Sequence, residues 1–485
     1  MGRKFAIGSA VIVAMAAIAT ASALLLKVGD LAAKLRCPDK TECKKIVKDL
    51  APVKAGKPET ILILGSDRRR KAALADRGMP PRSDTIMLMR LDPAKGGIGL
   101  LSLPRDLKVD IPGHGADKIN TAYTIGGTRL TLKVVKQLTG LKVNHVVNVD
   151  FRGFQDAVNA IGCVYVDIDR RYYHSNVGLA PAAQYAEINV PAGYHKLCGE
   201  SALQFVRFRH TDDDLVRSAR QQDFLRQARR QVTLSSLIEK QNRLLDIFAS
   251  NTTSDIHKTP ELLSLLRLVL ASVQQPIRQI HWRGTLGPSY VTSTPSQIAK
   301  VANQFMGLQE SRGSFALSRV GSAKRHKSKR KRGSRSLKID PGAAGLEVAT
   351  VAGKQEADLV APQARRFPVV YPNLRARGSL YVDPPRVYNI KRGKRRYRSI
   401  KYVLRTSDGY YYGLMQSRWL DPPILKDPSE VRTIKRRKLE LFYDGDRLRL
   451  VAWRTPRAVY WVSNTLTQSL GTKQMLGIAA SLKLL

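Results

Sequence analysis

The alternation of short apolar runs with helical segments between Glu59 and Met306 constrains the fold of this chain most strongly. Strand-like runs such as "TILILGS", "NHVVNVD" and "CVYVDI" are separated by helical patterns such as "LTLKVVKQLTG" and "FRGFQDAVNAIG". Strands that alternate with helices build layered domains in which helices cover a central sheet. The pattern predicts an α/β domain over residues 59–308, with α-β-α layers and a mixed sheet.

Two neighbouring strands of this domain carry charges at their ends. The stretch "RSDTIMLMRLDPAKGGIGLLSLPRDLKVDIP", which begins at Arg82, contains two apolar runs joined by a Pro/Gly turn. Arg82 and Asp84 open the first run, while Arg105 and Asp106 follow the proline that ends the second. Carboxylates and guanidinium groups are therefore expected together at one edge of the sheet.

Further polar residues stand at predicted strand ends and helix starts. On a helix, Arg207 and Arg209 would diverge by about 200°, so we expect them at the end of an element, where they can converge. The complete candidate set is Asp67, Arg68, Arg82, Asp84, Arg105, Lys118, Asn120, Arg207, Arg209, Arg217, Arg220, Gln221 and Gln222.

The chemistry of this set suits a pyrophosphate. Asp67 and Asp84 are hard oxygen donors of the kind that hold Mg²⁺ together with substrate phosphate oxygens. Guanidinium groups match phosphate oxygens in a bidentate manner. Solvated strand-end charges that form weak surface pairs are the alternative interpretation, and spacing alone does not decide between the two.

The net charge and the N-terminal segment indicate which partners the chain binds and on which side of a membrane it lies. The formal net charge of +43 favours an anionic partner such as nucleic acid, acidic lipid or an acidic polymer. After a basic tail at residues 1–4, residues 5–26 contain no charge and are long enough to cross a bilayer. We expect a single-pass anchor with a cytoplasmic N-terminus; a signal peptide cleaved near Ala21-Ser22-Ala23 is the alternative. Both place the remainder outside the cytoplasm.

The four cysteines agree with export. An even number of cysteines in an exported chain predicts disulfides, most simply Cys37 with Cys43 and Cys163 with Cys198. Zinc is a weak alternative because neither pair has Cys-x-x-Cys spacing.

Three further segments complete the predicted organisation. Residues 27–58 are expected to form a stalk. Between Arg319 and Lys338 lie ten Lys or Arg residues and no acid, which predicts a disordered basic linker over residues 309–365. Residues 366–485 alternate apolar and basic residues around Asp-Gly turns, so we expect a small antiparallel β domain with a final helix near Lys473 to Leu482.

An ordered series of motifs resembles the LytR-CpsA-Psr family of cell-envelope proteins. The motifs are "LILGSDRR", "RSDTIMLMRLDP", "LLSLPRDLKVDIPG", "DKINTAY", "YHKLCGESALQFVRFRH" and "DLVRSARQQDFL". They extend from about Glu59 to Arg230, whereas the basic linker and the last domain lie outside the resemblance.

The resemblance implies a membrane-anchored phosphotransferase. Members of this family move a glycopolymer from a polyprenyl pyrophosphate carrier to a hydroxyl of a wall acceptor, typically peptidoglycan. By motif, Asp67 and Asp84 would hold Mg²⁺ or Mn²⁺, and Arg105, Arg207 and Arg209 would hold the pyrophosphate. Arg68, Lys118 and Gln222 would complete the phosphate shell, and the lipid tail would lie in an apolar tunnel between sheet and helices.

A non-catalytic exported protein that binds anionic wall polymers or lipids through its basic linker is the alternative function. The carboxylate pair argues against it, because carboxylates repel a polyanion whereas a metal-dependent transferase requires them. Nucleic acid is not expected as a partner of an exported chain.

Overall fold

A computed structural model describes residues 40–54, 56–66, 83–95, 97–180, 184, 186–208, 212, 214–256, 259–272, 277–307, 340–434, 437–444 and 447–485. The chain divides into two compact units. The first unit comprises Met1–Ile161 and Leu234–Gln309, and the second comprises Gly162–Thr233 and Glu310–Leu485. The predicted catalytic domain, residues 59–308, therefore contributes to both units.

A six-stranded mixed sheet forms the centre of the first unit. Its strand order is β11-β6-β1-β2-β3-β12, with β6 parallel to β1, β12 parallel to β3, and the other neighbours antiparallel. This confirms the predicted mixed sheet. The strands are β1 (Glu59–Ser66), β2 (Ser83–Asp92), β3 (Gly97–Leu103), β6 (His145–Asp150), β11 (Thr252–Ser254) and β12 (Ile277–Ile280).

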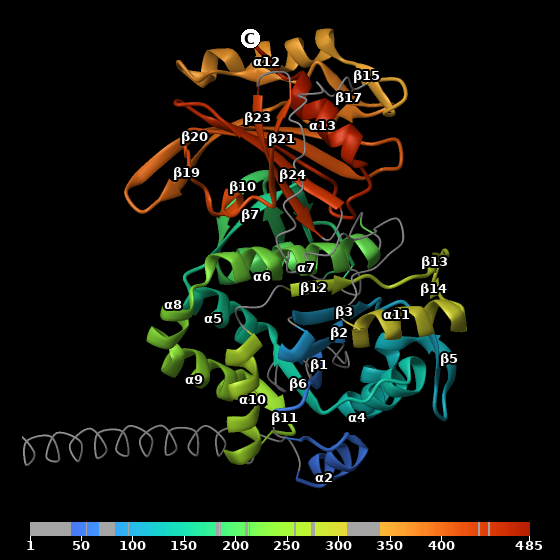
Figure 1. Ribbon diagram of the computed structural model, residues 1–485. Helices are drawn as coiled ribbons and strands as arrows, with labels where there is room; N and C mark the ends of the chain where they lie inside the picture. The colour runs from blue at the N-terminus through green and yellow to red at the C-terminus, as the bar shows by residue number, and fades with distance from the viewer. Residues whose placement is uncertain are drawn as a thin grey trace, which may run out of the picture. The chain divides into compact units, whose positions relative to one another are not determined.

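Helices cover both faces of this sheet because its strands are apolar on both sides (Figure 1). Leu62 and Leu64 of β1 face the core beneath α4, α11 and α2, whereas Ile61 and Ile63 face α9 and α10. The alternation follows the two-residue period of a strand. The helices of the first unit are α2 (Lys40–Asp49), α4 (Ile119–Thr139), α5 (Phe151–Ile161), α8 (Leu234–Glu239), α9 (Gln241–Asn251), α10 (Thr259–Ser272) and α11 (Pro295–Gly307), with a short 3₁₀ helix, η1 (Pro93–Lys95).

The register brings four strand ends to one edge of the sheet. Ser66, the last residue of β1, pairs with Ser83 at the start of β2 and with Asp150 at the end of β6. The end of β3 lies at the same edge, since Leu103 pairs with Ile86 of β2. Two hairpins complete the unit: β4 (Lys108–Ile111) with β5 (Gly115–Lys118), and β13 (Thr285–Leu286) with β14 (Val291–Thr292).

The second unit joins the segment after α5 to the C-terminal half of the chain. In that segment β7 (Val164–Ile168) pairs with β10 (Gly193–Leu197), and β8 (Tyr172–His174) pairs with β9 (Ile188–Val190). Two helices follow, α6 (Gly199–Arg207) and α7 (Asp214–Gln231). A disulfide between Cys163 and Cys198 confirms one predicted pair. Cys43 is also disulfide-bonded, and its predicted partner Cys37 lies outside the described residues.

An antiparallel sheet dominates the C-terminal half, as predicted, and α13 (Thr472–Ser481) confirms the expected final helix. The sheet has the order β18-β20-β21-β25-β24-β23-β22, and β19 also pairs with β20. Its strands are β18 (Leu380–Tyr381), β19 (Arg386–Arg392), β20 (Arg395–Arg405), β21 (Tyr411–Ser417), β22 (Glu430–Ile434), β23 (Arg437–Asp444), β24 (Arg447–Arg454) and β25 (Val459–Ser463). Shorter elements are β15 (Leu346–Val348), β16 (Val370–Tyr371), β17 (Leu374–Ala376), β26 (Lys483–Leu484) and η3 (Pro423–Leu425).

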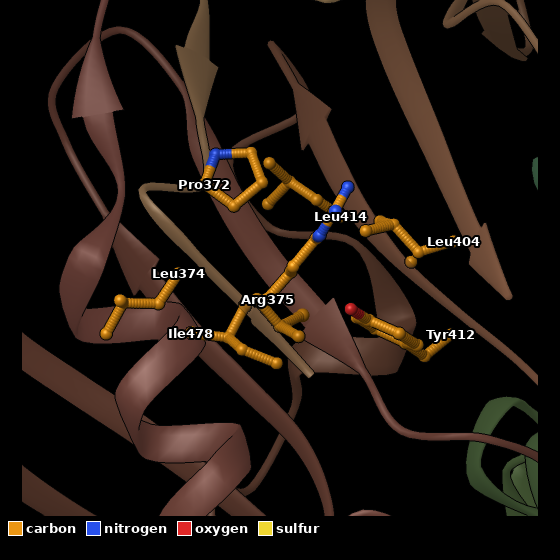
Figure 2. A pocket seen from close by; sticks show the side chains of 9 residues that line it. Pro372, Leu374, Arg375, Leu404, Tyr412, Leu414 and Ile478 are labelled. Carbon is orange, nitrogen blue, oxygen red and sulfur yellow. The ribbon is translucent and has the colours of Figure 1, made fainter. Parts of the chain in front are cut away.

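The core between this sheet and α13 is tightly closed. A cavity of about 10 Å³ lies in this core, and Leu374, Tyr412, Leu414 and Ile478 are among the residues that line it. Figure 2 shows these side chains. That volume is about the size needed for one water molecule. The cavity therefore belongs to the packing of the core and offers no space for a ligand.

The predicted linker is structured at its C-terminal end. Residues 340–364 include β15 and α12 (Thr350–Ala364), in place of the disordered chain expected there. Ala357, Val360 and Ala364 are buried in the core shared with the C-terminal sheet. The basic run from Arg319 to Lys338 lies outside the described residues. Among the described residues, no helix combines the length and apolar character of a membrane span, and the predicted anchor, residues 5–26, is not among them.

A buried charged cluster ties β1, β6 and β11 together in the first unit. His145 Nδ1 lies 2.8 Å from Asp255 Oδ2, and His145 Nε2 lies 3.5 Å from Glu59 Oε2. Burial acts to lower the pKa of His145, but hydrogen bonds and charges from Asp255 and Glu59 outweigh it and raise the pKa to about 9. The imidazolium is therefore the form that the folded unit favours at neutral pH.

We expect this cluster to make stability depend on pH. Because the folded pKa of His145 exceeds the unfolded value of about 6.5, its stabilisation is complete below about pH 6.5 and is lost as the pH rises through about 9. The expected loss is about 3 kcal/mol. Thermal unfolding at pH 6.5 and 9.5 should show this loss in the wild type and not in His145→Gln. The exposed His114 offers a control, and a His114→Gln variant that also abolished the pH dependence would contradict the assignment.

Candidate active site

Arg105, Asp106 and Lys118 form a charged cluster at the edge of the first unit's sheet, which we term the sheet-edge cluster. Arg105 Nε lies 3.5 Å from Asp106 Oδ2, and Lys118 Nζ lies 3.0 Å from Asp106 Oδ1. Pro104 directly follows β3 and is itself followed by Arg105 and Asp106. Lys118 is the last residue of β5 and directly precedes α4. One carboxylate thus holds two cations that the sequence places thirteen residues apart.

Backbone hydrogen bonds fix the sheet-edge cluster in place. The amide of Asn120, in the first turn of α4, donates to the carbonyl of Arg105 at 3.2 Å. The amide of Val291 donates to the carbonyl of Asp106 at 2.9 Å. The predictions that Lys118 and Asn120 stand at a helix start, and that Arg105 follows a strand at the same edge, are confirmed.

The cluster is accessible and carries an excess of positive charge. The side chains of Arg105, Asp106 and Lys118 are 19%, 24% and 33% exposed, respectively. Two cations share one carboxylate, so the cluster retains a net positive charge. Donors held in advance near solvent can bind an anion and stabilise negative charge that develops on it.

Of the two predicted metal-binding residues, Asp84 is the second residue of β2, and Asp67 directly follows β1 in sequence. Ser83 Oγ lies 3.3 Å from the carbonyl of Gly65 and donates to the carbonyl of Thr85 at 3.0 Å, which ties the start of β2 to the end of β1. Asp67, Arg68, Arg82 and the side chain of Asp84 lie outside the described residues.

The donor chemistry of these carboxylates fits a hard divalent cation, which takes oxygen ligands. The register that pairs Ser66 with Ser83 brings the end of β1 and the start of β2 to the edge where β3 ends before Arg105. Within the described ranges, no group of three or more His, Cys, Asp or Glu side chains could hold a metal ion.

The remaining candidate residues belong to the second unit. Arg207 ends α6, whereas Arg217, Arg220, Gln221 and Gln222 lie on α7. Arg217 and Gln222 are buried, at 4% and 1% exposure, and Gln221 donates to the carbonyl of Val206 at 3.2 Å. Arg209 lies outside the described residues.

Arg220, which the sequence places in the candidate site, is buried away from solvent. Its side chain is fully buried, forms an ion pair with Asp212 and donates to the carbonyl of Phe208. Its guanidinium also lies 4.7 Å from the ring centroid of Tyr172. A buried arginine must be paired to be tolerated, and Asp212 supplies the pair.

Three residues of this buried cluster were not identified from sequence as parts of the site: Arg170, Tyr172 and Asp212. Arg170 Nη2 lies 2.5 Å from Asp212 Oδ1, and its guanidinium lies 4.7 Å from the ring centroid of Tyr172. Burial raises the pKa of Tyr172 well above its usual value, so the phenol stays neutral. The run "TDDD" signalled carboxylates after Arg209, but nothing in its spacing distinguishes Asp212 from its neighbours.

The comparisons with known proteins point to one family. The model of the LytR_cpsA_psr family matches residues 26–306, more than half of the chain. Teichoic acid transferase TagU of Oceanobacillus iheyensis is 34% identical over 204 residues, which cover 40% of this chain and 58% of TagU. TagT of Bacillus subtilis is 33% identical over 197 residues, 40% of this chain and 56% of TagT. The full names of both describe a polyisoprenyl-teichoic acid–peptidoglycan teichoic acid transferase.

Solved structures resemble part of the chain. TagT bound to LI-WTA is 26% identical, with coverage of 54% of this chain and 95% of that one, and a TM-score of 0.40. YwtF (TagT) with bound octaprenyl pyrophosphate lipid is 25% identical, with coverage of 54% and 94% and a TM-score of 0.38. The chain spans just over half the length of the curated relatives it matches. On the strength of the family match over residues 26–306, the chain belongs to the LytR-CpsA-Psr family.

Proposed function

We propose that this protein is a phosphotransferase that moves a glycopolymer from a polyprenyl pyrophosphate carrier to a hydroxyl of a cell-wall acceptor such as peptidoglycan. Membership of the family and the names of the relatives support this activity. The observation that carries the proposal is the sheet-edge cluster, in which Asp106 holds the cations of Arg105 and Lys118 beside the strands that lead to Asp67 and Asp84.

The proposed reaction is a displacement at phosphorus. The acceptor oxygen attacks the phosphorus that carries the glycan, a phosphodiester forms, and the bond to the bridging oxygen breaks, so polyprenyl phosphate leaves. Negative charge then grows on the non-bridging and leaving oxygens. Arg105 and Lys118 would stabilise this charge without moving, because Asp106 and the backbone already fix their positions.

Asp67 and Asp84 are proposed to hold Mg²⁺ or Mn²⁺, a cation that neutralises phosphate charge when bound. A carboxylate is also proposed to accept the proton of the acceptor hydroxyl. Asp67, Asp84 and Asp106 are the candidates. Asp106 already faces two cations, which suits it to holding them rather than to accepting a proton.

The family resemblance implies further residues for phosphate binding. Arg207, Arg209, Arg217, Gln221 and Gln222 are proposed to contact phosphate oxygens, as family resemblance implies. Arg220 is proposed to act indirectly: it binds Phe208 and Asp212, the described residues on either side of Arg209 in sequence. A fully buried guanidinium suits this positioning role better than contact with the substrate.

A lipid tail requires an apolar surface, and the first unit offers one between its sheet and α9 and α10. The side chains of Ile63, Met89, Val149 and Phe248 are only partly buried there. We propose that they line the path of the polyprenyl chain. The predicted anchor, residues 5–26, would hold the catalytic part at the outer face of the membrane where such a carrier lies.

The proposal is tested by incubating the purified chain with a short glycan-linked polyprenyl pyrophosphate, peptidoglycan fragments and Mg²⁺. We expect release of polyprenyl phosphate in equal amounts to new glycan–peptidoglycan phosphodiester. The net charge of +43 favours the second candidate function, a non-catalytic binder of anionic wall polymers. Tight binding of polymer with no release of polyprenyl phosphate would select the binder and overturn the transferase.

A further inference from the structure

An open cleft of about 760 Å³ lies within the second unit and is not part of the proposed active site. Its volume falls in the range of about 300–1,000 Å³ that is usual for small-molecule sites. The cleft lies between the end of β9, the end of α12 and strands β19 and β20. It is lined by Arg171, Asn189, Pro191, Ala192, Gln363, Asp383, Pro384, Pro385, Arg386, Val387, Lys401 and Val403.

Two guanidinium groups in the cleft are held in place without being neutralised. Arg171 donates through Nε and Nη2 to Asn189 Oδ1 at 3.4 and 3.2 Å, and its guanidinium lies 4.7 Å from the ring centroid of Tyr173. Arg386 Nη1 donates to the carbonyl of Ala192 at 2.8 Å and lies 2.8 Å from His195 Nε2. Within the described part of the chain, neither arginine forms an ion pair with a carboxylate.

The other charged groups leave the cleft positive. Lys401 is already paired with the buried Asp167, at 2.7 Å between Nζ and Oδ1. Burial and the charge of Arg386 lower the pKa of His195 to about 4, so this ring is neutral and adds no charge to the cleft. Asp383 contributes one negative charge to the lining, whereas Arg171 and Arg386 contribute two positive charges. The balance favours an anion over a cation or a neutral ligand.

The rest of the lining suits hydroxyl groups. Asn189, Gln363 and Asp383 present amide and carboxylate groups that can donate to or accept from sugar hydroxyls. Three prolines, at positions 191, 384 and 385, restrict the backbone of the walls and limit the entropy lost on binding. A site with two fixed guanidinium groups, several planar polar groups and stiff walls fits a charged, hydroxyl-rich molecule.

We propose that this cleft binds an anionic saccharide, with the acidic group of one sugar between Arg171 and Arg386. A carboxylate and a phosphodiester share the chemistry that the two guanidinium groups recognise. This inference rests on the proposed function in one respect: the proposed function makes a wall glycan the source of the saccharide. It assigns to the second unit the task of holding polymer while the first unit carries the sheet-edge cluster.

Isothermal titration of the full chain with three probes tests this site. The probes are hexagalacturonate, which carries carboxylates, a mannose oligomer joined by phosphodiesters, and neutral maltohexaose. We expect at least one acidic probe to bind and maltohexaose not to bind. Binding of hexagalacturonate alone assigns the natural ligand to uronic-acid glycans, and binding of the phosphodiester oligomer alone assigns it to phosphate-linked glycans.

Variants separate this cleft from general attraction to a basic protein. Arg171→Ala and Arg386→Gln should each weaken binding of the acidic probe by about tenfold or more, since each removes a charge-assisted contact. Arg396→Ala removes an exposed cation of the same sheet outside the cleft and should leave binding unchanged. Equal losses in all three variants, equal binding of maltohexaose, or no binding of either acidic probe would overturn the inference. None of these readouts involves glycan transfer, so the proposed function can fail or stand independently.

Discussion

Replacement of Arg105 by Ala should lower the rate of glycan transfer by about 10²–10³-fold, which is the usual effect of losing one donor aimed at developing negative charge. Arg105 follows β3 and is held by Asp106 at 3.5 Å, so the guanidinium is in position before the substrate arrives. Stability should change by less than about 1 kcal/mol, because the ion pair is partly exposed and screened by solvent. Single-turnover release of polyprenyl phosphate, measured beside thermal unfolding, checks both expectations.

Arg129→Ala provides a matched control within the same unit. Arg129 lies on α4 and pairs with Asp49 at 2.7 Å, and its side chain is 31% exposed. Its loss also removes a partly exposed ion pair, yet it belongs to the packing of α4 against α2. Transfer should be unchanged in this variant. A loss of rate as large in Arg129→Ala as in Arg105→Ala would mean that charge or folding, rather than the sheet-edge cluster, accounts for the effect.

Replacement of Lys401 by Met should destabilise the second unit by about 3–5 kcal/mol, the usual cost of removing one partner from a buried ion pair. Lys401 of β20 is fully buried against Asp167 of β7. Asp167 also accepts hydrogen bonds from Trp461 Nε1 at 2.9 Å and from Ser463 Oγ. Burial acts to raise the pKa of Asp167, but Lys401 and these hydrogen bonds hold it below its ordinary value.

Thermal unfolding of the second unit measures this loss. Lys438→Met, which removes an exposed lysine from β23 of the same sheet, should change stability by less than about 0.5 kcal/mol. Combining Lys401→Met with Asp167→Asn should recover part of the loss, since no unpaired charge then remains buried. A Lys401→Met variant that unfolds like the wild type would contradict the claim that the buried ion pair stabilises the second unit.

Strand and helix periodicity was enough to predict β1, β2, β3 and β6 of the first unit's sheet, whereas β11 and β12 were not predicted. The two runs after Arg82 became β2 and β3, and the mixed order follows from segments recognisable as β1 and β6. The positions of Arg105 after a strand and of Lys118 at a helix start were predictable, whereas their shared contact with Asp106 was not. The pairing of Cys163 with Cys198 was predictable because export leaves few alternatives.

The burial of Arg220 and Lys401 and the packing of α12 could not be predicted, because they depend on contacts between residues far apart in sequence. Arg220 was predicted to bind substrate together with its neighbours on the same motif, whereas the structure buries it against Asp212 and Tyr172. Lys401 lies between apolar neighbours in "SIKYVLR", and only the distant Asp167 makes its burial tolerable. Helix α12 was assigned to a linker because it follows a basic run, although its buried alanines and Val360 pack into a core formed far along the chain.

The most direct test of the central claim is the metal dependence of glycan transfer in the wild type and in Asp67→Asn. With a short polyprenyl pyrophosphate substrate, we expect transfer by the wild type only with Mg²⁺ or Mn²⁺, and a chelator should stop it. Asp67→Asn should lose transfer while staying folded, and chelation should cause no further loss, because both changes act on the same step. A folded Asp67→Asn protein with full, metal-independent transfer would contradict the assignment of this sheet edge as the site of phosphate chemistry.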